Sequence, residues 1–199
     1  MIEWVEQFDH QLLLFINHAH APWLDQIMWS ISNKFVWFPL YLILFILVYL
    51  KYSWKHALIF TLLGFAAVGL ADFTATFGIK EVVARYRPSH HPILGPQLHF
   101  YEFKPGEWYK GGQYGFVSGH ATNSFVIAWM FILQLRHKFK YITPFLLIWA
   151  IVVCYSRMYL GVHYPSDIIG GTILGTAIAF LFHWMYRLIT TRISKVANN

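Results

Sequence analysis

Long apolar stretches dominate this chain and limit what it can fold into. Five of them, at about residues 35–50, 57–77, 118–135, 142–159 and 165–189, contain few charged side chains. About 20 apolar residues in helical form suffice to cross the hydrocarbon core of a bilayer. Only 12% of the 199 residues are charged, whereas a soluble domain has about a quarter. The sequence therefore predicts an all-α fold, a polytopic transmembrane helical bundle, with one membrane-embedded domain over residues 1–199.

The first 34 residues are apolar but interrupted. Asn17, His20 and Asp25 break the run, and polar or ionisable groups are costly in the middle of a bilayer. We expect residues 1–34 to form an amphipathic, interfacial helix, broken near Pro22, that leads into the first span. A sixth crossing is the alternative, so the bundle is expected to have five or six spans.

Lysine and arginine predict the orientation, because in short loops they gather on the cytoplasmic side. One end of the bundle would collect Lys51, Lys55, Arg136, Lys138, Lys140, Arg187, Arg192 and Lys195. The other end would collect Lys34, Lys80, Arg85, Arg87, Lys104, Lys110 and Arg157. We expect the first end, with the C-terminus, to be cytoplasmic, because several cations of the second end have a ligand to bind. Arg85 is expected to be an interfacial side chain that reaches toward the head groups.

Three polar segments converge on the second end. They are "KEVVARYRP" (80–88), "VSGH" (117–120) and "SRMYLGVHYPSD" (156–167), and the alternation of spans puts all three on one membrane face. Lys80, Arg87 and Arg157 would surround one pocket, which is unfavourable without an anion between them. A phosphate fits, because arginine binds its oxygens in a bidentate manner and lysine adds a point charge. On a continuing helix Lys80 and Arg87, seven residues apart, would face the same way.

A helix start adds to this anion site. Ser118 and Gly119 open a predicted span, where free backbone N–H groups and the positive end of the helix dipole attract anions. Gly119 lets the backbone approach a ligand closely. Ser118 can cap the helix and also donate to a phosphate oxygen. We therefore expect both residues to help hold the phosphate.

Two histidines and an aspartate complete the chemistry. A neutral imidazole, that of His163, can attack phosphorus and form a phosphohistidine. Asp167, four residues later in the first turn of a helix begun at Pro165, can hold the other ring nitrogen as N–H. His120 would act as general acid toward the departing alkoxide and then activate water. The loop histidines at 90, 91 and 99 invite a zinc site, but their spacing matches no metal motif, so no metal is expected.

Together these residues resemble a family signature. Its three parts are matched, in order, by Lys80, Arg87 and Pro88, by Ser118, Gly119 and His120, and by Ser156, Arg157, His163 and Asp167. The signature is that of the type 2 phosphatidic-acid phosphatase superfamily, and the specific match covers residues 80–167. The resemblance implies metal-free, cofactor-free hydrolysis of phosphate esters with the roles given above. In integral-membrane members it also implies a helical bundle with the site at the outer leaflet.

Three features outside the ionisable set carry smaller expectations. Val117 stands where the family usually has proline, and we expect only a small effect on rigidity. The extracytoplasmic loop 88–117 should lie over the site, where it gates lipid entry, selects head groups or forms an aromatic belt segment. Gly170, Gly171 and Gly175 are expected to be close helix-packing positions.

The substrate is predicted less closely than the reaction. A short chain with an amphipathic start is similar to bacterial undecaprenyl-diphosphate phosphatases, which makes undecaprenyl diphosphate the leading expectation and the bacterial inner membrane the expected location. The signature residues bind the phosphate and do not specify the lipid, so phosphatidic acid, phosphatidylglycerol phosphate and lipid A phosphates remain alternatives. A lipid phosphotransferase and a transporter of anionic lipids or phosphate are alternatives of other classes. No nucleic-acid partner is expected, and the sequence does not give the oligomeric state.

Overall fold

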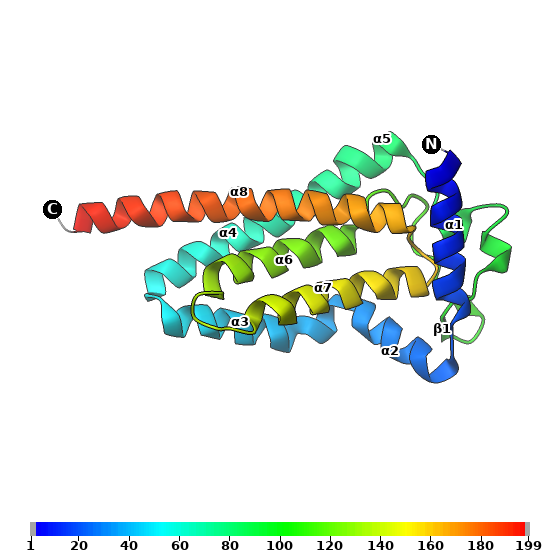
Figure 1. Cartoon of the computed structure of the whole chain (residues 1–199), viewed down its shortest axis with the longest axis horizontal. Coiled ribbons are helices and arrows are strands. Elements are labelled where there is room, and N and C mark those ends of the chain that lie inside the picture. Colours follow the sequence, from blue (N-terminus) through cyan, green and yellow to red (C-terminus); the bar gives the residue numbers. More distant parts are fainter. Residues whose placement is uncertain (1–2, 198–199) are drawn as a thin grey trace.

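The computed structural model describes residues 3–197, without the side chains of 195–197, and is a bundle of helices closed at one end by short helices and loops (Figure 1). The helices that run along the bundle are α3 (Phe38–Lys51), α4 (Trp54–Phe73), α6 (Gly119–Leu135), α7 (Ile142–Tyr159) and α8 (Pro165–Ala197). The predicted all-α membrane bundle is confirmed, and the helix bounds differ from the predicted spans by a few residues at most ends.

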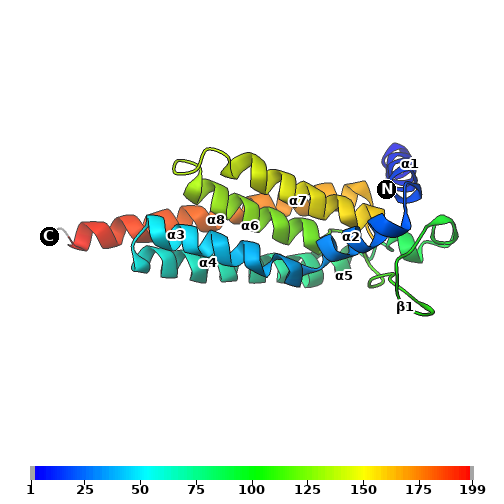
Figure 2. The ribbon, with the colours of Figure 1, turned by 90° about the horizontal axis from the view of Figure 1, so that it is seen from below.

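Four helical stretches of the described chain are long and apolar enough to cross a membrane. They are Lys34–Lys51, Trp54–Val83, Ile142–Tyr159 and Pro165–Ser194. The helix α6 has 17 residues, lies beside these stretches and packs mainly against α8 and α7 (Figure 2). The number of crossings, five or six, stays a prediction.

The helix that contains the second span ends before Arg87, one of the predicted phosphate-binding residues. The helix α4 continues through the π-helical stretch η2 (Thr74–Lys80) into α5 (Glu81–Val83). It stops at Ala84, whose φ of 48° is left-handed. Arg87 then lies in extended backbone directly before the short 3-10 turn η3 (Pro88–His90). A helix that continues from Lys80 to Arg87, on which both side chains would face the same way, is therefore not formed, and any meeting of these two side chains has another cause.

The N-terminal segment forms two helices, α1 (Glu3–His18) and α2 (Pro22–Ser32), so the predicted break near Pro22 is confirmed. Proline at the start of α2 suits a position that needs no backbone N–H donor. The helix α1 lies across the end of the bundle, whereas α2 leads through η1 (Lys34–Trp37) into α3 (Figure 1). The buried amide of Asn17 fastens α1 by donating to the carbonyls of Tyr159 and His99. Whether α1 lies at the interface stays a prediction.

The long connection between α5 and α6 lies at the same end of the bundle as α1 (Figure 1). After η3 it contains the 3-10 turn η4 (Gly95–Gln97) and a two-stranded antiparallel hairpin, β1 (Glu102–Lys104) with β2 (Glu107–Trp108). This end therefore brings together the first helix, the long loop and the starts of α6 and α8.

Glycines allow α8 to approach α6 closely. A Cβ atom at Gly175 would lie 2.2 Å from the carbonyl oxygen of Thr122, and one at Gly171 would lie 2.5 Å from that of Ser118. A Cβ at Gly170 would lie 2.7 Å from Val117 Cγ1. The prediction that these three glycines are packing positions is confirmed, and their effect is to fix the start of α6 beside the start of α8.

Gly175→Ala should separate α6 from α8 and destabilise the protein by about 1–3 kcal/mol, because the added methyl group meets backbone that cannot move alone. The thermal unfolding midpoint in detergent measures this. Gly69→Ala is the control, since nothing lies within 4 Å of a Cβ at that position. Equal midpoints for the two variants would contradict the close packing of α6 and α8.

Candidate active site

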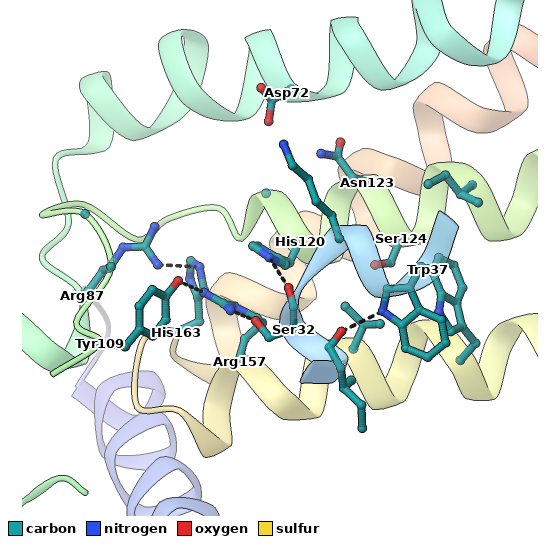
Figure 3. A pocket seen from close by; sticks show the side chains of 18 of the residues that line it. Ser32, Trp37, Asp72, Arg87, Tyr109, His120, Asn123, Ser124, Arg157 and His163 are labelled. Carbon is teal, nitrogen blue, oxygen red and sulfur yellow. Dashed lines mark hydrogen bonds between the residues drawn. The ribbon is translucent and has the colours of Figure 1, made fainter. Parts of the chain in front are cut away.

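A cavity of about 300 Å³ lies where the start of α6 meets α2, α4 and the end of α7 (Figure 3). It is lined by six of the eight predicted site residues, namely Lys80, Arg87, Gly119, His120, Arg157 and His163. The other two, Ser118 and Asp167, are fully buried and lie behind its wall. Residues from three distant segments of the sequence are thus assembled around one cavity.

His163 and Asp167 form a buried pair. The N–H at Nδ1 of His163 donates to Asp167 Oδ2 over 3.2 Å, and the backbone N–H of Tyr164 donates to the same oxygen over 3.0 Å. On the other side of the ring, Arg87 Nη1 lies 2.8 Å from Nε2. Arginine can only donate, so Nε2 carries the lone pair and Nδ1 carries the proton. The nucleophilic nitrogen therefore faces the cations.

The surroundings of His163 keep it neutral. Burial lowers the pKa of His163 well below its ordinary value, and the charges of Arg87, Arg157 and Lys80 lower it further. The residue lies in the loop between α7 and α8 and is 1% exposed. At neutral pH the ring is uncharged, which is the state that can attack an electrophile.

The two arginines are held by fixed acceptors. Arg87 donates from Nε to the carbonyl of Tyr114 and from Nη1 to that of Val162. Burial lowers the pKa of Arg87, and the like charge of the nearby Arg157 lowers it further. Lys80 and Arg87 reach the same cavity although no helix joins them, because these backbone carbonyls direct Arg87 inward.

Arg157 lies in the last turn of α7 and is 2% exposed. It donates from Nη2 to the hydroxyl of Tyr109 over 2.7 Å and from Nη1 to the hydroxyl of Ser32. Among the described residues its Nε has no hydrogen-bond partner. The residue therefore has a donor left for a ligand, and it connects α2 and the long loop to the cavity.

His120 is fixed by α2. Its Nε2 lies 3.1 Å from the carbonyl oxygen of Ser32, and because a carbonyl only accepts, Nε2 carries a proton. Ser118 caps α6 as predicted, with Oγ accepting the backbone N–H of Ala121 over 3.4 Å. That hydroxyl does not line the cavity, whereas Gly119 at the helix start does. Donation from Ser118 to a phosphate stays a prediction.

The surroundings of the Arg85 side chain differ from those predicted. It forms ion pairs with Asp9 of α1 at 2.7 Å and with Asp167 at 3.0 Å, and its side chain is 11% exposed. The expectation of an interfacial side chain is therefore wrong. Asp9 also accepts from the backbone N–H and the hydroxyl of Ser166. The helix α1 is thus linked, through Arg85, to the carboxylate that holds His163.

The cavity also contains polar residues outside the motifs. They are Ser32, Lys34, Asp72, Tyr109, Asn123 and Ser124. Tyr109 belongs to the long loop, so that loop reaches the site. None of them belongs to a motif with a recognisable spacing, and for Asp72 the available signal was a carboxylate inside an apolar run.

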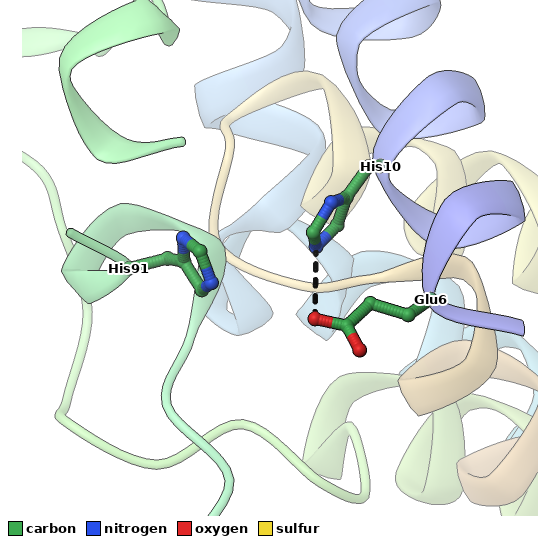
Figure 4. A group of neighbouring side chains, drawn as sticks. All are labelled: Glu6, His10 and His91. Atoms are coloured by element: carbon green, nitrogen blue, oxygen red, sulfur yellow. Dashed lines mark ion pairs between the residues drawn. The ribbon is translucent and has the colours of Figure 1, made fainter. Parts of the chain in front are cut away.

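The histidines considered for zinc do not gather at the cavity. His99 lies 2.9 Å from a carboxylate oxygen of Asp25, and His91 lies near Glu6 and His10 of α1 (Figure 4). The candidate ligand atoms of Glu6, His10 and His91 are all within 4.8 Å of one another. His91 Nδ1 accepts the backbone N–H groups of residues 93 and 94, so a neutral His91 ring has no free lone pair for a metal.

A family model matches most of this chain. Residues 57–190 match the model of the PAP2 superfamily, and this range includes all three motif segments. This chain belongs to the PAP2 superfamily. The resemblance inferred from the motifs is confirmed, and the protein is a membrane lipid phosphatase.

This PAP2 protein is similar to several characterised relatives. It is 33% identical to the lipid A 4'-phosphatase of Bacteroides thetaiotaomicron over 98% of this chain and 84% of the relative. It is 29% identical to the undecaprenyl-diphosphatase of Sulfolobus acidocaldarius over 87% of this chain and 76% of the relative. The crystal structure of a transmembrane PAP2-type phosphatidylglycerolphosphate phosphatase from Bacillus subtilis has the same fold, with a TM-score of 0.67, 24% identity, and coverage of 93% of this chain and 87% of that one.

Proposed function

We propose that the protein removes phosphate from a phosphorylated glycolipid of the lipid A type, without a metal and through a phosphohistidine on His163. The observation that carries the chemistry is the position of His163, whose Nε2 faces Arg87 in a cavity also lined by Lys80 and Arg157. The substrate is supported by the likeness to a lipid A 4'-phosphatase over 98% of this chain.

The first step transfers the phosphoryl group to the enzyme. Lys80, Arg87, Arg157 and the backbone N–H of Gly119 bind the phosphate oxygens, and His163 Nε2 attacks phosphorus. The bond between phosphorus and the sugar oxygen breaks as His120, which is protonated on both ring nitrogens once the phosphate dianion lies beside it, protonates that oxygen. Because Ser32 engages the Nε2 proton of His120, the transferred proton comes from Nδ1. The carboxylate of Asp167 stabilises the positive charge that forms on the His163 ring.

The second step hydrolyses the phosphohistidine and regenerates the free enzyme. His120, now neutral, accepts a proton from water at Nδ1, and the hydroxide attacks the phosphorus of the phosphohistidine. The N–P bond breaks, phosphate leaves, and the His163 ring again donates from Nδ1 to Asp167. Each histidine thus ends with the protons that it had at the start.

A second substrate has its own support. The sequence alone favoured undecaprenyl diphosphate, and the Sulfolobus relative is an undecaprenyl-diphosphatase. The same steps would cleave a diphosphate, with the second phosphate as leaving group. Measurement of phosphate release from a panel of lipid phosphates therefore decides which lipid is the substrate.

Purified protein in detergent with EDTA should release phosphate from a lipid A phosphate faster than from undecaprenyl diphosphate, phosphatidic acid or phosphatidylglycerol phosphate. His163→Ala should remove this release for every lipid, because the covalent acceptor is gone. Rates from a phosphate assay give the ranking. Release that needs added metal, or that survives His163→Ala, would contradict the mechanism, and faster release from undecaprenyl diphosphate would support the second substrate.

The lowered pKa of His163 predicts the pH dependence. The neutral ring reacts, so the acid limb of kcat/KM that belongs to His163 should lie below the ordinary value of 6.5. Lys80→Met removes one of the charges that lower this pKa, so the limb should move to higher pH while activity falls. Lys104→Met, an exposed lysine of β1, is the control and should leave the profile unchanged. Ionisation of the substrate affects all variants alike, and a limb that does not move in Lys80→Met would contradict the prediction.

We also propose that the enzyme lies in the bacterial inner membrane with its active site extracytoplasmic and its C-terminus cytoplasmic. Of the seven basic residues at the active-site end, four line the cavity, Lys34, Lys80, Arg87 and Arg157, and Arg85 is paired with carboxylates. Lys104 and Lys110 remain, against eight at the other end. This asymmetry favours a cytoplasmic location for the other end. Residues 1–34 and 88–117 would then lie on the outer side of a single domain.

Cysteine labelling tests this orientation. In a Cys154→Ser background, a membrane-impermeant maleimide applied to cells with a permeabilised outer envelope should label Lys104→Cys and leave Lys138→Cys unlabelled until the inner membrane is broken. Both positions are exposed, so access to reagent alone separates them. The reverse pattern would place the active site in the cytoplasm.

A further inference from the structure

The cavity changes character along α6. His120 and Gly119 stand at the phosphate end, Asn123 and Ser124 follow one turn later, and Ile127 lies one turn beyond them. Ile127 and Tyr41 also line a second, apolar cavity of about 390 Å³. That groove is walled by aromatic and aliphatic side chains of α3, α4 and α6. A lipid bound with its phosphate at His163 would therefore pass a polar band before its chains reach the groove.

Asp72 is the unusual member of this band. It lies on α4 inside a membrane-spanning stretch, is exposed, and makes no hydrogen bond or ion pair within the described part of the chain. Its Oδ1 lies 4.0 Å from where a Cβ at Gly119 would be, so it borders the phosphate end. A carboxylate in a span is costly, and beside a phosphate it also repels the substrate. Such a group is useful where the ligand offers hydrogen-bond donors next to its phosphate.

Two further groups of the band have no partner. Asn123 Oδ1 and Trp149 Nε1 are buried and unpaired among the described residues, and both side chains line the cavity. Trp149 is 5% exposed. Figure 3 shows Asn123 and Asp72 directed from α6 and α4 into the same part of the cavity. Buried polar groups are normally satisfied, so these two atoms are available to a polar ligand.

We infer that Asp72, Asn123 and Trp149 form a head-group subsite that hydrogen-bonds the sugar of a phosphorylated glycolipid, an inference that rests on the proposed function. Sugar hydroxyls can donate to Asp72 and to Asn123 Oδ1 and can accept from Trp149 Nε1. A prenyl phosphate has an apolar chain at this level, and a phosphatidic acid has ester groups that cannot donate. The subsite therefore selects glycolipid phosphates and disfavours the other two classes.

A rival role for Asp72 is to orient Lys80. Lys80 Nζ lies 3.6 Å from the same Cβ position at Gly119, so both side chains approach the start of α6. Orientation of Lys80 concerns the phosphate, which every substrate carries. Loss of that role would reduce hydrolysis of all substrates alike, whereas loss of a sugar contact would reduce hydrolysis of the glycolipid alone.

The test compares kcat/KM for a phosphorylated lipid A disaccharide and for phosphatidic acid in detergent. Asp72→Asn should lower the value for lipid A about tenfold, the worth of a hydrogen bond to a charged group, and should leave that for phosphatidic acid unchanged or raised. Asn123→Ala should show the same selectivity, so the test does not depend on one variant folding. Glu81→Gln, an exposed acidic residue of α5 outside the cavity, is the matched control and should change neither value.

The outcomes separate the inference from the proposed function. If the wild-type protein releases phosphate from phosphatidic acid but none from lipid A, the proposed substrate is wrong and the sugar subsite falls with it. If the wild-type protein hydrolyses lipid A but the two variants lose activity equally on both lipids, or on neither, the substrate stands and the subsite is overturned. A loss confined to lipid A in either variant supports the subsite.

Discussion

Three cations directed into one cavity are the constraint on which this end of the molecule depends. Lys80, Arg87 and Arg157 repel one another, and two of them are held by carbonyls and hydroxyls rather than by carboxylates. An ion pair at each would cancel the charge and leave nothing for a phosphate. Burial keeps His163 neutral and the same uncancelled field lowers its pKa further, so the charges that would bind the anion also help to activate the nucleophile. The carboxylate of Asp167 is placed behind the ring, where it orients the ring without facing the anion.

Much of this site could be predicted because its chemistry needs particular residue types near the ends of helices. The spacing of His163 and Asp167 gives their contact directly, since the intervening loop and the first turn of α8 are short. The sequence left open a continuous helix from Lys80 to Arg87, and the structure ends the helix at Ala84. The signal against it was present in Pro88, because the residue before a proline is disfavoured in helical backbone. The meeting of the two cations instead follows from carbonyls at residues 114 and 162, which sequence spacing does not reveal.

The residues that sequence reasoning missed are those whose partners lie far along the chain. From the sequence Arg85 is predicted to be an interfacial side chain. Its partner Asp9 is 76 residues away in sequence and is brought into contact by α1. Tyr109 is one aromatic residue among many in its loop, and its contact with Arg157 depends on how that loop lies over the bundle end. Asp72 is hidden in an apolar run, and its importance appears only when the cavity and the groove beside it are seen together.

The link from α1 to the site has a consequence for how the enzyme is made. Asp9 is synthesised before both of its partners, yet it ends fully buried against Arg85 and Ser166, the second of which follows 157 residues later. Until Arg85 has been made, the carboxylate of Asp9 lacks its ion-pair partner and needs hydration. Asp167 arrives with that last helix. The nascent chain therefore contains Lys80, Arg87 and Arg157 before it can orient His163, so hydrolysis begins only after α8 has entered the bundle.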